Sequence, residues 1–176
     1  MASKNKDIGA AAQWLTEWVI GLNLCPFAKI PYEKGRIRLI MDDCEDPYDG
    51  LAKLLAEAAR LGLEKTQTTL IVYSNSGPFS AFEDFMDFCA AANALLVEEG
   101  LDNEIQLAYF HPDFIFDGAE PTDPANAVSQ SPSPILHLLK TADVEEAIRQ
   151  HPNTASISTA NMEKLRKRAE KQKTKA

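Results

Sequence analysis

The sequence predicts a single α/β domain, built on a small three-stranded, largely parallel sheet flanked by helices, with further helices at the N- and C-terminal ends. Two observations support this fold class. The chain has 176 residues, of which 45% are hydrophobic and 25% are charged, values typical of one globular domain with a sizeable core. Strand-like and helix-like segments also alternate along the chain, and the helical segments are long enough to connect parallel strands.

Three segments have the composition of strands. Residues 36–41 alternate between apolar and polar, residues 68–73 form a β-branched run, and residues 104–110 alternate again. Right-handed crossovers would make the three strands parallel, so that their carboxyl ends meet at one edge, where ligands of such sheets bind. The residues that we expect at this edge are 42–43, 74–77 and 111–113.

Three segments, residues 7–23, 51–62 and 82–100, have apolar residues at helical spacing. Residues 135–140 and 144–150 are expected to form short helices, and residues 158–173 a terminal helix whose last turns lack an apolar face. We therefore expect an N-terminal arm over 1–9, the α/β domain over 10–152, and a C-terminal helix with a basic tail over 153–176.

Charge is unevenly distributed along the chain. The net charge is −8, but residues 162–176 hold seven Lys and Arg against two Glu, which leaves −13 on residues 1–161. The acidic body should repel nucleic acid, so a nucleic-acid partner is not expected. Neither a signal peptide nor a membrane span is recognisable, and the three cysteines have no disulfide or zinc-ribbon spacing, so we expect a cytoplasmic protein that does not bind membranes.

The strongest candidate site joins a thiol, an imidazole and a carboxylate. His111 follows the third strand, and Asp113 or Asp117 is close enough in sequence to fix its tautomer. Cys25 precedes Pro26, and two geometries are open for it. At the end of the first helix the thiol would be inert, whereas at the start of a new helical turn its pKa would fall. We predict Cys25 as nucleophile, His111 as base and Asp113 as the orienting group.

A metal site is the alternative use of the same residues. Cys25, His111 and His137, the last placed on the short helix 135–140, could bind a divalent metal with an open position for water. The acidic run 42–46 lacks the spacing of a calcium loop and is interpreted as a solvated loop. No glycine-rich nucleotide motif is present, so the cofactor is left open between a divalent metal and none.

The polar, proline-rich stretch 112–134 is a functional candidate in its own right. A loop of that length is uncommon inside a compact domain unless it has a function. Its candidate residues include Asp117 and Asp123.

Four blocks of sequence resemble one known family. They are Gly21-Leu22-Asn23-Leu24-Cys25-Pro26-Phe27-Ala28, Asp84-Phe85-Met86-Asp87-Phe88, Phe110-His111-Pro112 and the run from Ser131 to Leu139. In this order they are similar to the signature of the DUF1415 family, a domain of unknown function, over about residues 10–150. The resemblance implies no activity, but it marks Cys25, His111, Asn126 and His137 as positions of interest.

Three functions remain open at this point. The chain could be a small-molecule enzyme that uses Cys25, His111 and Asp113, a metal-binding protein, or a non-catalytic binding or interaction protein in which the conspicuous blocks serve packing and loop rigidity. The sequence leaves the substrate, the reaction, the metal and the oligomeric state undetermined.

Overall fold

The computed structural model describes residues 2–63, 68–150 and 153–174. Its elements follow one another along the chain in this order: α1 (Ala2–Gln13), the π-helix η1 (Trp14–Ile20), α2 (Lys29–Glu33), β1 (Ile37–Asp42), α3 (Pro47–Leu63), β2 (Thr68–Tyr73), α4 (Phe82–Glu98), β3 (Ile105–Phe110), the 3₁₀-helix η2 (Pro124–Val128), β4 (Ile135–Lys140), α5 (Thr141–Gln150), the 3₁₀-helix η3 (Thr154–Ser156) and α6 (Ile157–Lys173). The described part of the expected arm, residues 2–9, belongs to α1.

The sheet has four strands in the order β1-β2-β4-β3, so the prediction of three largely parallel strands was wrong in number and in pairing. β1 pairs with β2 in parallel, whereas β4 is antiparallel to both β2 and β3. The α/β class and the three predicted strands are confirmed. β1, β2 and β3 therefore do point the same way, with β4 inserted between the last two, and their carboxyl ends lie at one edge.

Residues 135–140 form the central strand β4 and not the predicted short helix. The segment Ile-Leu-His-Leu-Leu-Lys lies between two strands, so it contacts the core on both sides and shows no polar alternation. A short apolar run of this kind has no periodicity that separates a buried strand from a helix.

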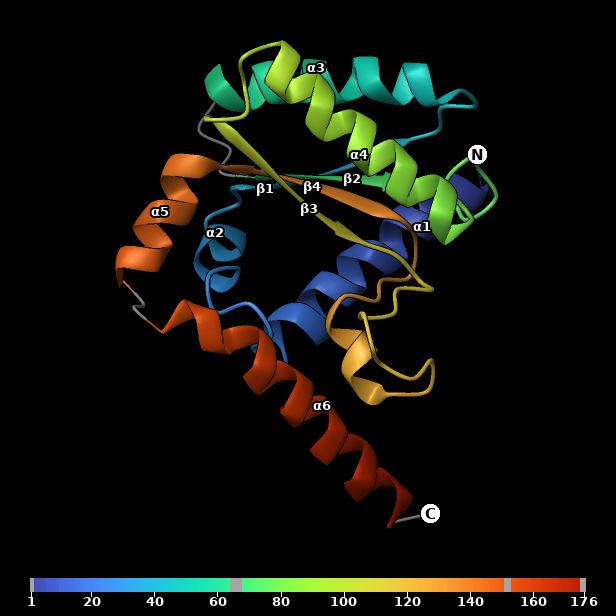
Figure 1. The fold of residues 1–176 in the computed structure, drawn as a ribbon, viewed down its shortest axis with the longest axis vertical. Coiled ribbons are helices and arrows are strands. Elements are labelled where there is room, and N and C mark those ends of the chain that lie inside the picture. Colours follow the sequence, from blue (N-terminus) through green and yellow to red (C-terminus); the bar gives the residue numbers. More distant parts are fainter. Residues whose placement is uncertain (1, 64–67, 151–152, 175–176) are drawn as a thin grey trace.

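Helices cover both faces of the sheet (Figure 1). α3 and α4 lie over one face, where Leu54, Phe85 and Leu96 pack against Ile71 and other buried side chains of the strands. α1 crosses the other face, and Ala11 packs there against the cluster of Leu70, Val72 and Ile135. α6 lies below α1 in this view, contacts η2 and carries the C-terminus away from the sheet.

The predicted first helix, residues 7–23, is interrupted near its end for a local reason. The N–H of Gly21 donates to Thr16 O at 2.9 Å, a π-type bond five residues back. A Cβ at position 21 would lie 2.3 Å from Glu17 O, so only glycine fits. Asn23 then takes a left-handed conformation with φ of 50°, and Leu24 N–H bonds Val19 O, which ends the helix as glycine or asparagine commonly does.

Candidate functional site

His111 lies at the carboxyl end of β3 and is completely buried. One ring nitrogen, Nε2, is 3.2 Å from Phe79 O, and the other, Nδ1, accepts a hydrogen bond from the main-chain N–H of Asp113 at 3.1 Å. The Phe79 carbonyl can only accept, so Nε2 carries the proton and donates. The rings of Phe82 and Phe85 pack on the imidazole at centroid distances of 5.4 and 5.5 Å. Both nitrogens are thus bonded to the main chain.

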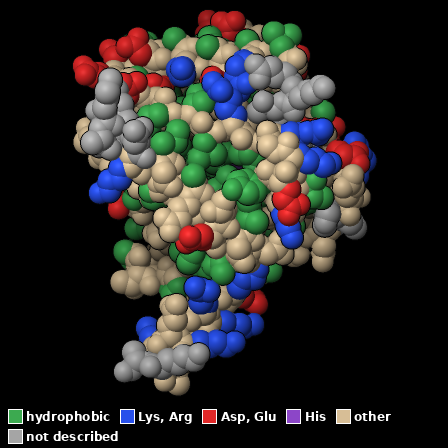
Figure 2. All heavy atoms as spheres, turned by 180° about the vertical axis from the view of Figure 1, so that it is seen from behind, with side chains coloured by type: hydrophobic (Ala, Val, Ile, Leu, Met, Phe, Trp, Pro, Cys, Tyr) green, Lys and Arg blue, Asp and Glu red, His purple; other side chains and the backbone are tan. Residues whose placement is uncertain are grey.

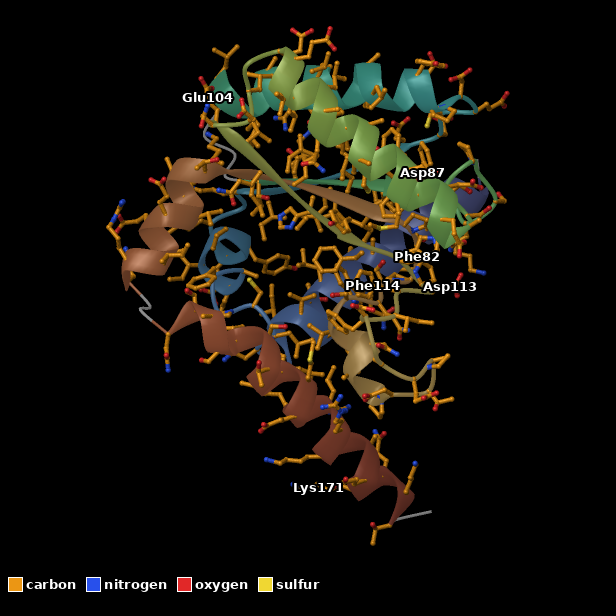
Figure 3. The ribbon with its side chains drawn as sticks, viewed as in Figure 1. Phe82, Asp87, Glu104, Asp113, Phe114 and Lys171 are labelled. Atoms are coloured by element: carbon orange, nitrogen blue, oxygen red, sulfur yellow. The ribbon has the colours of Figure 1, made fainter. Side chains whose placement is uncertain are left out.

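Asp113 contacts His111 through its main chain, while its side chain is exposed. Figure 3 shows Asp113 at the surface beside Phe82 and Phe114, whose rings are 5.6 Å apart. Asp117 is also exposed. Among the hydrogen bonds of the described residues, both nitrogens of the His111 ring bond to main-chain groups. Neither the Asp113 nor the Asp117 carboxylate therefore orients the imidazole.

The 112–134 loop is fastened along its length. The buried amide of Asn126 donates from Nδ2 to Glu120 O at 2.9 Å, and its Oδ1 accepts from Phe116 N–H at 3.1 Å. Asp123 accepts from Ala125 N–H at the start of η2 and pairs with Arg166 of α6 at 2.6 Å, which lowers the pKa of this carboxyl to about 2. These contacts hold a fixed loop shape.

Two tryptophans, which lie within the predicted helix 7–23, tie this loop to the first helical segment. Trp14 Nε1 donates to Gln130 O, and Trp18 Nε1 donates to Ala127 O, both at 3.0 Å. A buried indole N–H needs an acceptor, and here the loop main chain supplies it. Gln130 in turn donates from its side chain to Phe114 O at 3.0 Å.

Cys25 belongs to neither helix. It lies between η1, which ends at Ile20, and α2, which begins at Lys29, and it directly precedes a turn over residues 26–28. The N–H groups of Phe27 and Ala28 donate toward its sulfur and lower the pKa of the thiol, but burial outweighs them and the pKa is raised. The neighbouring Leu24 O accepts from Asn161 Nδ2 of α6 at 2.6 Å. The pairing of Cys25 with His111 remains a prediction.

His137 lies on β4, where Nε2 is hydrogen-bonded to Thr68 Oγ1. Burial lowers the pKa of this imidazole to about 4, so the ring is neutral at physiological pH. Among the residues that the structure describes, no three His, Cys, Asp or Glu side chains form a group that could hold a metal ion. The proposed set of Cys25, His111 and His137 thus gains no geometric support.

The carboxyl end of β1 holds a further candidate site. The sequence placed residues 42–43 at the ligand-binding edge of the sheet, but we interpreted the acidic run 42–46 as a solvated loop and named no site there. Asp42, the last residue of β1, is only 8% exposed, and its register partner on β2 is Tyr73, which is 1% exposed. Asp42 Oδ1 accepts from Cys44 N–H at 3.1 Å, whereas Asp42 Oδ2 and the Tyr73 hydroxyl have no hydrogen-bond partner.

A groove of about 610 Å³ runs past Asp42, between the β1–α3 connection and the first turns of α3. Its charged lining residues are Asp42, Asp43, Glu45, Asp49 and Lys53. Burial raises the pKa of Asp42, and the hydrogen bond from Cys44 N–H, the nearby charge of Lys53 and the Cys44 thiol counteract this only in part. Burial and the charge of Asp42 likewise raise the pKa of Tyr73.

Glu57 of α3 shows how this protein satisfies a buried carboxylate elsewhere. Glu57 is 5% exposed, and it accepts from Arg38 at 3.2 and 3.4 Å and from Arg60 at 2.9 Å. Asp42 lies on the same face of β1 as Arg38 but has no such cation in hydrogen-bond contact. Among the described residues, the fold therefore supplies two cations to the Glu57 carboxylate but none within hydrogen-bond distance of the Asp42 carboxylate.

Fold and site together define a small α/β protein with one mixed sheet and a polar groove at its carboxyl edge. The chain belongs to the family described as protein of unknown function DUF1415, whose model matches residues 7–175 and so includes α6. No curated protein and no solved structure matches the chain. None of the helices in the described ranges is long and apolar enough to cross a membrane.

Proposed function

We propose that the protein binds a small molecule carrying a positively charged nitrogen, and that this group enters the groove at the end of β1 and bonds Asp42. Of the functions that the sequence leaves open, this is the non-catalytic binding protein. Its proposed binding site is the groove at Asp42 and not the region of Cys25 and His111. One observation carries it: the buried Asp42 Oδ2 has no partner. A buried carboxylate oxygen without a donor is costly, by about 1–3 kcal/mol, and proteins keep few of them.

The charge of the groove selects the ligand class. Four carboxylates and one ammonium line it, so it attracts cations and repels anions. An ammonium or guanidinium group would do for Asp42 what Arg38 and Arg60 do for Glu57. The position also agrees with the general rule that ligands bind beyond the carboxyl ends of parallel strands, and β1 and β2 are the parallel pair of this sheet.

The first turn of α3 keeps the groove in shape. Gly50 is buried there, and a Cβ at this position would lie 3.1 Å from the Phe88 ring and 3.3 Å from Cys44 Sγ. Glycine thus lets α3 approach Cys44 and α4 closely. Burial and, to a lesser extent, the charge of Asp42 raise the pKa of the Cys44 thiol to about 11, so Cys44 lines the groove as a neutral thiol and is not a nucleophile.

The Cys25, His111 and Asp113 enzyme and the Cys25, His111 and His137 metal site remain weaker proposals. Both need an imidazole nitrogen that is free to accept a proton or a metal. Main-chain groups occupy both ring nitrogens of His111, and the Thr68 hydroxyl occupies Nε2 of His137.

Calorimetric titration tests the proposal with agmatine, which carries a guanidinium and an ammonium, and with succinate as an anion of similar length. We expect agmatine to bind and succinate not to bind at pH 7.5. Asp42→Asn should weaken agmatine binding by about 10- to 100-fold, the loss of one hydrogen bond to a charged group. Asp87→Asn, which removes an exposed carboxylate on α4, is the matched control.

Two results would overturn the proposal. Failure of agmatine and of further primary amines and guanidines to bind would remove the ligand class. Equal weakening by Asp42→Asn and Asp87→Asn would reduce the effect to general attraction by an acidic surface. Circular dichroism of both variants checks that each is folded.

A further inference from the structure

A second groove, of about 640 Å³, lies at the other end of the molecule, between α6 and the turn that follows η1. Leu22 and Leu165 form an apolar part of its lining, and Lys164, Arg168 and Lys171 are among its charged residues. Figure 2 shows Lys and Arg side chains gathered on the projecting lower end, where α6 lies. This groove has the opposite charge to the groove at Asp42.

Lys164, Arg168 and Lys171 are four and three residues apart, so they lie on one face of α6 over a length of about 10 Å. Lys164 and Arg168 are held in place by uncharged partners, so their positive charges are not neutralised by these contacts. Lys164 Nζ donates to Leu22 O at 2.9 Å and to Asn23 O at 3.3 Å. The Arg168 guanidinium carbon is 5.8 Å from the Trp18 ring centroid, in cation–π contact.

Other cations of α6 differ in this respect. Arg166 points to the 112–134 loop and pairs with Asp123 at 2.6 Å, and Lys167 lies 3.9 Å from Glu163. Within the described residues, Arg168 and Lys171 form no ion pair with a carboxylate. Figure 3 shows Lys171 on the part of α6 that projects from the body.

We propose that this groove binds the phosphate groups of a small organic phosphate, with Arg168 and Lys171 as the anion-binding residues and Lys164 fixing the entrance. Guanidinium and ammonium groups are the usual protein ligands of phosphate. The apolar side chains of Leu22 and Leu165 would contact the organic part. A compact phosphate suits the site better than a nucleic acid, because the −13 charge of residues 1–161 repels an extended polyanion.

The same chemistry could come from a free phosphate or from a phospholipid headgroup, and one experiment distinguishes them. The full chain is titrated at constant ionic strength with sodium tripolyphosphate and, separately, with phosphatidylcholine vesicles containing phosphatidylglycerol. Tryptophan fluorescence is the readout, recorded in a Trp14→Phe background so that the signal comes from Trp18, because an anion that draws Arg168 away from the indole changes its surroundings. Response to tripolyphosphate supports a soluble ligand, and response to the vesicles alone supports a headgroup.

The variants decide whether the groove itself is responsible. Binding to the variants is measured by calorimetric titration, because Arg168→Gln itself removes the cation from the Trp18 ring. Arg168→Gln combined with Lys171→Gln should weaken binding at least tenfold, and Lys171→Gln alone should weaken it without any effect on packing, since Lys171 is exposed. Lys29→Gln combined with Arg149→Gln removes the same charge from α2 and α5 and should leave binding unchanged. No response to either probe, or equal losses in the two double variants, would overturn the proposal.

Discussion

Replacing His111 with alanine distinguishes a structural from a catalytic histidine. The substitution empties a fully buried site, removes the donor to Phe79 O and removes the acceptor of Asp113 N–H. Losing a buried ring costs about 3–5 kcal/mol in other proteins, and an unsatisfied buried carbonyl about 1–3 kcal/mol. These two costs overlap, because both arise from the same vacated space. We expect His111→Ala to lower the free energy of unfolding by about 3–5 kcal/mol.

Urea unfolding followed by tryptophan fluorescence measures this change, and it reports on the loop directly because Trp14 and Trp18 are bonded to it. Asp113→Ala is the matched control. It keeps the main-chain N–H that contacts the imidazole and removes an exposed carboxylate, so it should change stability by less than about 0.5 kcal/mol. If His111→Ala stays within about 1 kcal/mol of the parent protein, or if Asp113→Ala destabilises as strongly, the structural assignment of His111 is refuted.

Three further predictions follow from pKa directions. Burial raises the pKa of Cys25 and raises that of Cys89 to about 12, so iodoacetamide at pH 7 should label both thiols slowly. Fast labelling of Cys25 that is lost in His111→Ala would instead establish a pair of Cys25 and His111. The folded pKa of Asp42 lies above its unfolded value, so its contribution to stability is lost as pH rises through the folded pKa, and Asp42→Asn should raise Tm at pH 7; a lower Tm would contradict this. The pKa of His137 falls from 6.5 to about 4, so stability should drop as pH falls through that window, and a smaller drop in His137→Gln, followed by calorimetry, checks it.

The sequence predicted those parts of the fold whose signals are local. β2 is a β-branched run, and α4 has a clear apolar face that ends before Gly100, which has φ of 69°. β4 could not be predicted in the same way, because its identity depends on pairing with strands far away in the chain. Inserting it between β2 and β3 converts the expected parallel sheet into a mixed one while the directions of the other three strands are unchanged.

The candidate residues could be selected by type but not by environment. The partner of His111 Nε2 is 32 residues away in sequence, so its occupation could not be inferred from neighbouring residues. Asp42 offered a signal that we did not use. Residues of a strand alternate between faces, so Arg38, Ile40 and Asp42 share one face, and Ile40 packs against the core beneath α3 and α4. Extending the predicted strand by one residue would have placed Asp42 at a buried position.

Some residues of the family blocks are explained by how the chain turns and how it holds its long loop. Gly21 and Asn23 end the first helical segment, and His111 is hydrogen-bonded to the main chain where the loop begins. Asn126, Trp14 and Trp18 lie outside the blocks and hold the loop further along. None of these roles involves a free reactive group, so the blocks alone give no reason to assign a reaction.

The charged side chains of the two proposed sites, Asp42, Arg168 and Lys171, lie outside the family blocks. We propose a cationic ligand for the Asp42 carboxylate and an anionic ligand for the Arg168 and Lys171 side chains on α6. Each groove repels the ligand class that the other attracts, so the two sites can be titrated independently in one protein. A ligand that binds one groove should therefore leave the affinity of the other unchanged apart from the salt-dependent attraction between charges, which is screened beyond about 8–10 Å at physiological ionic strength.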